Sequence, residues 1–362
     1  MSLDSSLWAV LQQAVTEGHT PGAVALIGRG ARILAHVAVG QRMVVPEARP
    51  MELDTVFDLA SLTKPISTAT CILHLLERGG LCLGDPVSRY LRFEGDGRER
   101  ITLWHLLTHS SGLPPYVNYL SLLGDAVPPA QRRVRVIEET GKLPLQWAPG
   151  EGFAYSCLGY ILLASVVEAV SGQTLDVYAK EHIFDPLEMT QTCFCPPPEL
   201  AARCAATEVL AEGVLCGVVH DENARYLGGV GGNAGLFSTA ADLARYAQAL
   251  LAVARGESAP KGPPFPLTSA AVRLMTTAQS KIPGGERSLG WDVETDYTPQ
   301  VRGDLFRPGG IGHSGYTGTS MWLDPMSGGY CILLTNRVHL GRDKDISRLR
   351  RQVANIAAAM AS

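Results

Sequence analysis

The sequence lacks any apolar run of about 18 residues, the length that a membrane-spanning helix requires. It also lacks a recognisable signal peptide, because Met1–Trp8 has neither a basic start nor an apolar core, although a leader removed from the native protein would fit as well. Charge of one sign is not in excess: 31 Lys and Arg stand against 35 Asp and Glu, for a net charge of −4. These absences predict no membrane span, a cytoplasmic location and no nucleic-acid partner.

The eight cysteines form no recognisable metal or disulfide framework. Those closest together in the chain match none of the usual zinc spacings, and no histidine stands at a paired interval: Cys193, Cys195, Cys204 and Cys216. His105 and His109 are four residues apart but have no glutamate between them, so a packing role is favoured. We expect buried free thiols and no metal site.

The chain of 362 residues is 46% apolar and 18% charged, which predicts a large folded core. Hydrophobic periodicity predicts helices and strands in a distinct order. Expected helices lie at 4–17, 66–76, 103–107, 131–139, 157–170, 175–182, 242–254, 268–276 and 346–360. Expected strands lie at 23–28 and 33–40, which look like a hairpin, and at 316–323 and 330–335.

Strands thus occupy the two ends of the chain and helices the middle. An α+β fold, with one antiparallel sheet built from both termini and flanked by helices, satisfies this order. We expect residues 1–65 and 240–362 to form the sheet domain and residues 66–239 a mainly helical domain, with the functional site at their interface.

The segment Ser61-Leu62-Thr63-Lys64-Pro65 precedes the predicted helix at 66–76. A serine there can be a helix N-cap, but a lysine three residues later is unfavourable at the positive end of a helix. Residues three apart share one helix face, so the Ser61 hydroxyl and the Lys64 amine can meet. Burial and the helix dipole are expected to lower the pKa of Lys64, which would place a base beside a nucleophile.

Two later segments carry groups suited to the same chemistry. Tyr155 is either a half-buried aromatic residue whose hydroxyl satisfies a loop carbonyl, or a general base toward Ser61. Glycines around His313-Ser314-Gly315 mark either a bulge or a strand edge that a substrate can approach closely. His313 would there orient the phenol or contact a substrate, unless it is structural.

Taken in order, Ser61-x-x-Lys64, Tyr155-Ser156-Cys157 and His313-Ser314-Gly315 resemble the three motifs of the serine β-lactamase and penicillin-binding protein superfamily. The most similar branch is the class C β-lactamase-like one, which includes D-alanyl-D-alanine carboxypeptidases, D-aminopeptidases and β-lactamase-fold esterases. Flanking segments resemble that branch too: 103–113, 220–224, 235–243 and 335–339. The resemblance implies a β-lactamase/transpeptidase-like fold, no cofactor, and a small ester, amide or peptide substrate.

The resemblance also implies roles for single residues. Ser61 would attack a carbonyl carbon while Lys64 and Tyr155 move its proton, and water would release the acyl group. The backbone N–H groups of Ser61 and Tyr316 would hold the oxyanion. The remaining motif residues would contact the substrate: Cys157, His313, Ser314 and Gly315.

Cys157 is the main departure from the family pattern, which has Asn, or Asp in some subgroups, at this place. A thiol is a weak donor and a weak acceptor, so it holds the amide side chain of a substrate poorly. This disfavours efficient penicillin or cephalosporin turnover and leaves hydrolysis of less demanding esters reasonable. For Cys157 itself, a small packed residue is favoured over a second nucleophile.

His220 and Asp221 have two interpretations. They cap a loop by side-chain hydrogen bonding, or they line the pocket, because the glycine-rich segment 228–235 follows closely.

The sequence therefore predicts a serine hydrolase that forms an acyl-Ser61 intermediate with small carboxylic esters or D-amino-acid-type amides. The alternatives are a D-alanyl-D-alanine carboxypeptidase, a weak β-lactamase and, in another class, a non-catalytic penicillin-binding or sensor protein.

Overall fold

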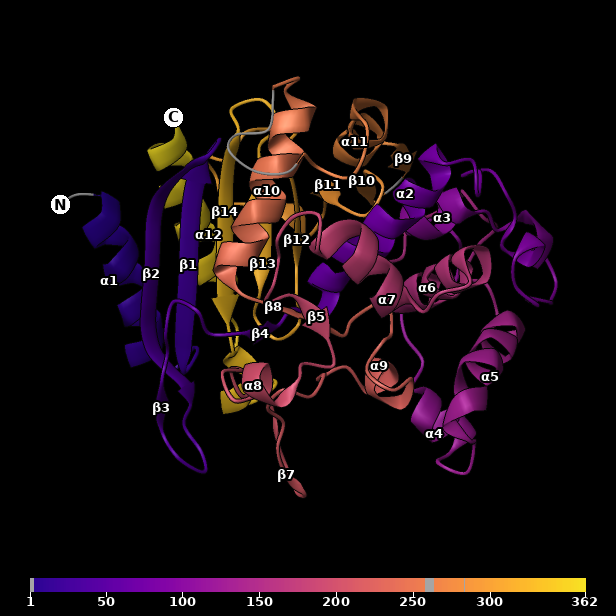
Figure 1. The fold of residues 1–362 in the computed structure, drawn as a ribbon, viewed down its shortest axis with the longest axis horizontal. Coiled ribbons are helices and arrows are strands. Elements are labelled where there is room, and N and C mark those ends of the chain that lie inside the picture. Colours follow the sequence, from indigo (N-terminus) through magenta and orange to yellow (C-terminus); the bar gives the residue numbers. More distant parts are fainter. Residues whose placement is uncertain (1–2, 258–263, 283) are drawn as a thin grey trace.

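A computed structural model describes residues 3–257, 264–282 and 284–362. Within them, the centre of the fold is an antiparallel sheet of strand order β3-β2-β1-β14-β13-β12-β11-β10-β9. β1 (Gly22–Arg29) pairs with β14 (Gly329–Thr335), so the two ends of the chain meet inside the sheet (Figure 1). The other strands are β2 (Arg32–Met43), β3 (Arg49–Pro50), β9 (Ser280–Ile282), β10 (Gly285–Arg287), β11 (Asp292–Thr295), β12 (Ile311–Ser314) and β13 (Ser320–Leu323). The predicted α+β fold, with a sheet built from both termini, is confirmed.

Helices cover both faces of this sheet because its central strands are apolar on both sides. In β1, Ala25 contributes to one apolar cluster and Leu26 to another, as the alternation of side chains along a strand requires. Helices α1 (Leu3–Thr16) and α12 (Ser347–Ala361) pack on one face, and α10 (Ala240–Ala254) packs on the other (Figure 1).

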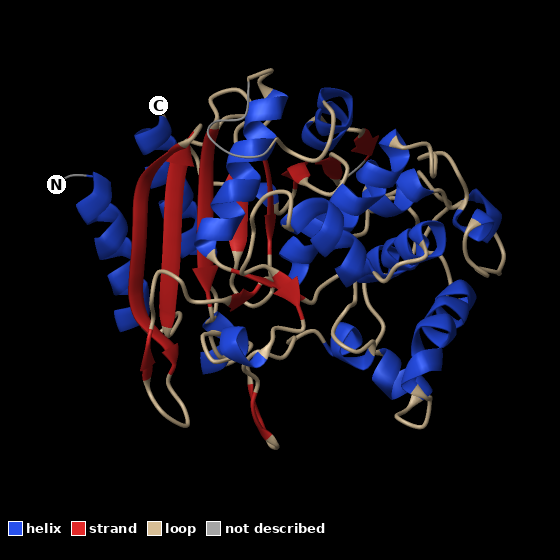
Figure 2. Ribbon diagram, in the orientation of Figure 1, coloured by secondary structure: helices blue, strands red, loops and turns tan. Residues whose placement is uncertain are grey.

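The middle of the chain forms a layer of helices beside the sheet (Figure 2). Its buried centre is α2 (Thr70–Glu77) with α6 (Cys157–Ser171). The other helices are α3 (Leu103–Leu107), α4 (Tyr119–Leu123), α5 (Pro129–Lys142), α7 (Leu175–Ala179), α8 (Pro198–Ala201), α9 (Glu222–Tyr226) and α11 (Ser269–Thr276). Of the helices described, none alone is long and apolar enough to cross a membrane, although α6 and residues Leu175–Phe184, bent by 77°, reach that length and composition together.

Two smaller sheets lie near the helical layer. The strands β4 (Phe57–Asp58), β8 (Leu236–Ser238) and β5 (Cys193–Phe194) form one, in the order β4-β8-β5. The hairpin of β6 (Val209–Leu210) and β7 (Gly213–Val214) projects from the body of the molecule (Figure 1). Because β4 ends directly before the Ser61 turn, the first of these sheets positions that turn.

One prediction about local structure was wrong in part, and two expected helices are present but include a π-helical turn. The strand expected at 316–323 begins only at Ser320, because residues 315–319 form a turn closed by a 2.7 Å hydrogen bond from the Gly315 N–H to the Thr319 carbonyl. The helix expected at 66–76 begins as a wider π-helical turn, Lys64–Ala69, and the helix expected at 175–182 ends in a similar turn, Lys180–Phe184. Strands β9 to β12 were not predicted, since runs of three or four residues carry little periodicity. The division into two domains at residues 65 and 240 stays a prediction.

Candidate active site

Ser61 lies on a tight turn that follows β4. Ala60 has φ of 46°, a left-handed conformation that is uncommon for a residue with a Cβ atom. The Asp58 carboxylate holds this turn by accepting a 2.8 Å hydrogen bond from the Ala60 N–H. The same carboxylate accepts a 2.7 Å hydrogen bond from the His220 N–H, which joins the turn to a distant loop. Ser61 itself lies inside a 3₁₀ turn, Ala60–Leu62, so its interpretation as a helix N-cap was wrong.

Lys64 points back at Ser61 from the first position of the π-helical turn. Its Nζ donates hydrogen bonds of 2.9 Å to the Ser61 Oγ and 2.9 Å to the backbone carbonyl oxygen of Asn233. A weaker contact of 3.6 Å reaches the Cys157 Sγ. The side chain is fully buried, so the ammonium depends on these three acceptors for its solvation.

The titration behaviour of this cluster differs from the expected one. Burial favours a neutral Lys64, but the anionic forms of Cys157 and Tyr155 attract the ammonium and leave the pKa of Lys64 raised above its ordinary value. The expectation of a lowered Lys64 pKa was therefore wrong. Burial also raises the pKa of the Tyr155 phenol and of the Cys157 thiol, in both cases against the attraction of Lys64. The pKa values of all three groups are thus raised, so each group releases its proton less readily than it would in water.

Tyr155 stands between cations and histidines. The Lys64 Nζ lies 4.9 Å from the centre of its ring, and the guanidinium carbon of Arg287 lies 5.9 Å from it. The rings of His109 and His313 lie at centroid distances of 4.5 Å and 5.7 Å. The Tyr155 hydroxyl is buried and, although Lys64 and Ser61 are near enough to influence its pKa, it has no well-formed hydrogen bond to the described residues. It is therefore available to a bound molecule.

The two histidines are neutral and carry opposite hydrogen-bonding roles. Burial, together with the charges on Arg287 and Lys64, holds the pKa of both His109 and His313 well below the ordinary value. The His313 Nδ1 lies 2.9 Å from the Ser314 carbonyl oxygen, so Nδ1 carries the proton and Nε2 is an acceptor. The His109 Nδ1 accepts a 3.0 Å bond from a backbone N–H, so its Nε2 is a donor. The site thus presents one acceptor and one donor near the phenol.

The turn after β12 packs tightly against the Ser61 turn. The Thr319 hydroxyl donates a 3.0 Å hydrogen bond to the Leu59 carbonyl oxygen, and a Cβ on Gly315 would lie only 2.5 Å from that oxygen. Gly315 therefore permits this close approach. The Tyr316 N–H has no hydrogen-bond partner among the described residues. An unpaired N–H beside the nucleophile is what an oxyanion donor requires.

A pocket of 750 Å³ opens over Ser61 and brings the predicted residues together. Of these, Lys64 does not line it but lies beneath Ser61, while the others are in its wall: Ser61, Tyr155, Cys157, His220, Asp221, His313, Ser314, Gly315 and Tyr316. The prediction that His220 and Asp221 lie at the pocket agrees with this geometry. Asp221 also caps α9, since its carboxylate accepts a 2.8 Å bond from the Ala224 N–H, so both interpretations of this pair apply.

Sequence reasoning missed several residues of the site. Arg287, at the end of β10, is 2% exposed and lies 3.8 Å from the Asp292 carboxylate, with its Nε and one terminal nitrogen unpaired among the described residues. Asn233 was missed because it acts on Lys64 through its backbone carbonyl. Further pocket residues that were not predicted are Tyr116, Asn118, Phe153, Glu222, Arg337, Arg342 and Arg350. One signal was available for Arg287: it lies two residues before the apolar, buried segment 289–291.

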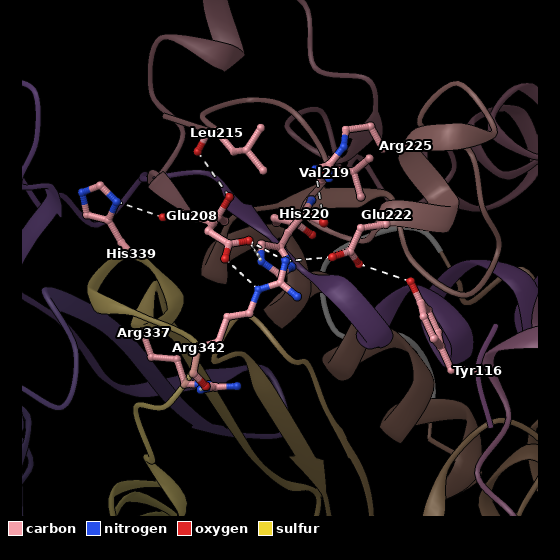
Figure 3. A network of polar contacts seen from close by, with 12 residues as sticks. Tyr116, Glu208, Leu215, Val219, His220, Glu222, Arg225, Arg337, His339 and Arg342 are labelled. Atoms are coloured by element: carbon pink, nitrogen blue, oxygen red, sulfur yellow. Dashed lines mark hydrogen bonds and ion pairs between the residues drawn. The ribbon is translucent and has the colours of Figure 1, made fainter. Parts of the chain in front are cut away.

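One side of the pocket mouth is closed by a polar network (Figure 3). Arg342 donates two 2.7 Å hydrogen bonds to Glu208 and one of 2.7 Å to Glu222. Glu208 also contacts the His220 Nε2 at 3.0 Å, and Glu222 accepts a bond from Tyr116 at 3.3 Å. The network joins the loop before α12 to the loops around α9 and Tyr116, so these loops are held relative to one another.

Tyr316 connects this network to the reactive centre. Its ring stacks on His220 at a centroid distance of 5.6 Å, with an interplanar angle of 24°. The guanidinium carbon of Arg337 lies 4.8 Å from the same ring. The side chain that follows the His313-Ser314-Gly315 motif is thus held between two pocket residues, which restricts where its N–H can point.

Within the described residues, no group of three or more His, Cys, Asp or Glu side chains is placed to hold a metal ion. All eight cysteines are free thiols, as expected, but they are not all buried: Cys82 and Cys195 are exposed.

The sequence of this chain is similar to those of known proteins of one family. The chain matches the family model described as Beta-lactamase over residues 8–355. A relative from Escherichia coli (strain K12) named "Putative D-alanyl-D-alanine carboxypeptidase" is 31% identical over 79% of this chain and 70% of its own. A relative from Bacillus subtilis (strain 168) named "N-acetylmuramyl-L-alanine amidase" is 30% identical over 88% of this chain and 78% of its own.

Solved structures share the fold at lower identity. A class C beta-lactamase superimposes with a TM-score of 0.77 at 17% identity, covering 98% of this chain and 95% of its own. EstCE1, a hydrolase with promiscuous acyltransferase activity, superimposes with a TM-score of 0.76 at 22% identity, covering 98% of both chains.

Proposed function

Because the chain belongs to the beta-lactamase family, we propose that it is a serine hydrolase that works through an acyl-Ser61 intermediate. Its proposed substrates are small carboxylic esters or D-amino-acid-type amides. The observation that carries the proposal is the 2.9 Å hydrogen bond between the Lys64 Nζ and the Ser61 Oγ, at the floor of a large pocket. A hydroxyl beside a group that can exchange its proton is the arrangement of an activated nucleophile.

In this proposal, the Ser61 Oγ attacks the substrate carbonyl carbon and its proton passes to the pair formed by Lys64 and Tyr155. The pair must first lose one proton, because at rest the lysine is charged and the phenol is neutral. The ammonium stabilises the phenolate that this loss creates. The pair then delivers the proton to the departing alcohol or amine, and water attacks the acyl carbon to release the acid and restore the serine.

The developing negative charge on the carbonyl oxygen would be held by the N–H groups of Ser61 and Tyr316. Each donor of this kind contributes about 2.7–4 kcal/mol to the transition state. The unpaired state of the Tyr316 N–H and the clamping of its ring by His220 and Arg337 support this role.

The nature of position 157 supports esters over β-lactams as substrates. The Cys157 thiol is neutral and lines the pocket, where an amide side chain of a substrate would need a strong hydrogen-bonding partner. Small esters make no such demand. The name of the Escherichia coli relative, a putative D-alanyl-D-alanine carboxypeptidase, supports D-amino-acid-type amides as the second proposed class, and the name of the Bacillus subtilis relative, an amidase, supports amides in general.

The test is labelling with a fluorophosphonate, followed by peptide mapping with mass spectrometry. The expected result is a single adduct on Ser61, and an adduct on another residue overturns the assignment. In turnover of p-nitrophenyl acetate, Ser61→Ala should remove all activity and Lys64→Ala nearly all of it.

Two alternatives follow from the same site. A D-alanyl-D-alanine carboxypeptidase would release D-alanine from short peptides faster than it cleaves p-nitrophenyl acetate. Cys157 is the reason to consider a non-catalytic penicillin-binding or sensor protein. Such a protein would bind penicillin at Ser61 but would hydrolyse esters no faster than the Ser61→Ala variant. A panel of esters, D-alanyl peptides and nitrocefin separates these outcomes.

A further inference from the structure

The buried ammonium of Lys64 has an unusual set of partners. Two of its acceptors are strong, the Ser61 Oγ and the Asn233 carbonyl oxygen, both at 2.9 Å. The third, the Cys157 sulfur at 3.6 Å, is long and weak. The Asn233 carbonyl is therefore the main anchor of Lys64 apart from the nucleophile itself, and its position decides how closely Nζ approaches Ser61.

Asn233 lies on a loop whose backbone is held by side chains: Thr68 donates a 2.7 Å hydrogen bond to the Gly232 carbonyl oxygen, and Arg133 donates one of 2.7 Å to the Val230 carbonyl oxygen. The segment 228–235 lies between α9 and β8, and several of its glycines have left-handed backbone conformations, including Gly232 with φ of 82°. The Asn233 side chain is 1% exposed, and its Nδ2 donates a 3.1 Å hydrogen bond to the Asp221 carboxylate. This bond is a tertiary restraint on the residue whose carbonyl holds Lys64.

Asp221 is well suited to act as a fixed point. Its carboxylate oxygen accepts the 2.8 Å capping bond from the Ala224 N–H as well as the bond from Asn233. The residue before it, His220, donates its N–H to Asp58, which also holds the Ser61 turn. Through these bonds, the position of Asp221 is fixed relative to Ser61.

We propose that Asp221 and Asn233 act as a pair of positioning residues that hold Lys64 against Ser61, in place of the amide that position 157 lacks. Asp221 fixes the Asn233 side chain, and the Asn233 backbone carbonyl fixes the ammonium. The inference rests on the proposed function, since positioning of Lys64 matters only if Ser61 is acylated.

The experiment measures the rate of fluorophosphonate labelling of Ser61 and the kcat and KM for p-nitrophenyl acetate. Asp221→Ala and Asn233→Ala should each lower kcat and the labelling rate about tenfold or more, because displacement of a reacting group by about 1 Å can cost 100-fold. KM should change less than kcat, because both changes act mainly on the position of Lys64, although Asp221 also lines the pocket. Asp221→Asn keeps an oxygen that accepts both bonds, so it should retain activity within about threefold.

The double variant separates a shared role from two independent defects. If the two residues act as one unit, Asp221→Ala/Asn233→Ala should be no slower than the slower single variant. Losses that multiply overturn the proposal, as does an Asp221→Ala enzyme with the wild-type labelling rate. In a Cys157→Asn background, Asn233→Ala should cost less than about threefold, because the restored amide supplies a second anchor.

Two controls keep the outcomes distinct. Thr268→Ala removes the N-cap of the distant helix α11 and should lower the melting temperature without changing kcat, which shows what loss of a cap alone does. Where an alanine variant does not fold, Asn233→Asp replaces the donor by a carboxylate facing Asp221 at nearly constant size. It should be about tenfold slower than wild type, and unchanged kinetics overturn the proposal. A wild-type protein that is not labelled at Ser61 overturns the proposed function instead.

Discussion

Replacing Cys157 by asparagine tests what limits the substrate range of this site. The thiol sulfur lies 3.6 Å from the Lys64 Nζ, too far for a strong bond. An asparagine carbonyl oxygen reaches about 0.6 Å further from its Cβ than a thiol sulfur does, so it would meet the ammonium at an ordinary hydrogen-bond distance of about 3 Å. Its amide N–H would at the same time face the pocket that Cys157 now lines.

The size of the effect follows from the hydrogen bonds gained. A hydrogen bond between neutral groups contributes about 0.5–1.5 kcal/mol, and about 1.4 kcal/mol corresponds to a tenfold change in rate. If the new amide binds the substrate amide in the transition state, nitrocefin turnover should rise up to about tenfold. Turnover of p-nitrophenyl acetate should change by less than about threefold, because an acetyl group has no amide to bind.

The assay compares kcat/KM for nitrocefin and for p-nitrophenyl acetate in wild type, Cys157→Asn and Cys157→Ser. Serine is the matched control, since its hydroxyl is polar but reaches no further than the thiol and offers no carboxamide. A folded Cys157→Asn protein with wild-type ester turnover and unchanged nitrocefin turnover would refute the reasoning. An equal gain in the serine variant would refute it too.

Three further predictions concern the turn after β12, the polar network of Arg342 and the protonation of Lys64 and Tyr155. Gly315→Ala should lower kcat about 100-fold and destabilise the fold by about 1–3 kcal/mol, because its Cβ would push that turn away from the Ser61 turn. Arg342→Gln should lower the free energy of unfolding by about 1 kcal/mol near pH 7. The hydrogen bond from Arg342 lowers the pKa of Glu208, so this stabilisation is present above the unfolded carboxyl pKa of about 4.3 and is lost as the pH falls through the lowered folded value. Finally, kcat/KM for p-nitrophenyl acetate should rise with pH from neutral into the alkaline range, since the raised pKa values of Lys64 and Tyr155 make the singly deprotonated pair scarce at pH 7.

Each of these predictions has a control. Gly84→Ala introduces a methyl group into open space and should leave kcat unchanged, so an equal loss in both glycine variants would contradict the packing argument. For Arg342→Gln, urea unfolding at pH 7 and at pH 3 should give a difference from wild type that closes at low pH, and a constant difference contradicts the assigned cause. A kcat/KM that is constant or falls between pH 7 and pH 9 contradicts the assigned protonation of Lys64 and Tyr155.

The sheet was predictable because its signal is local and strong. The segment 22–28 is buried at every position, and 329–335 likewise, so each reads as a central strand without knowledge of its partner. Their pairing across the whole chain followed from economy of topology. The strands β10 and β11 gave no such signal, since each has only three or four residues, and Arg287 on β10 was therefore lost from the predicted site.

Residues that contribute a side chain to the candidate site could be predicted from the sequence, and residues that contribute only their backbone could not. Tyr155 and His313 were found through their motifs, and the structure places both in the pocket. Asn233 was not found, because a carbonyl oxygen belongs to every residue and only the path of the loop brings this one to Lys64. The same holds for Gly315, whose importance lies in the 2.5 Å that separates an absent Cβ from the Leu59 carbonyl oxygen.

The wrong expectation for Lys64 shows what a sequence motif omits. Burial favours the neutral amine, and that part of the reasoning stands. The pKa of Lys64 is nevertheless raised, because the lowering effect of burial is outweighed. What burial cannot include is the set of acceptors that the fold gathers around the ammonium, Asn233 and the ionisable groups of Cys157 and Tyr155. With Lys64 charged and the nearby His313 neutral, the proposed reaction depends on a phenolate that the ammonium stabilises rather than on a free amine. Any group that keeps the ammonium close to Ser61 and Tyr155 therefore assists proton transfer, which is why the Asp221–Asn233 pair can matter without touching the substrate.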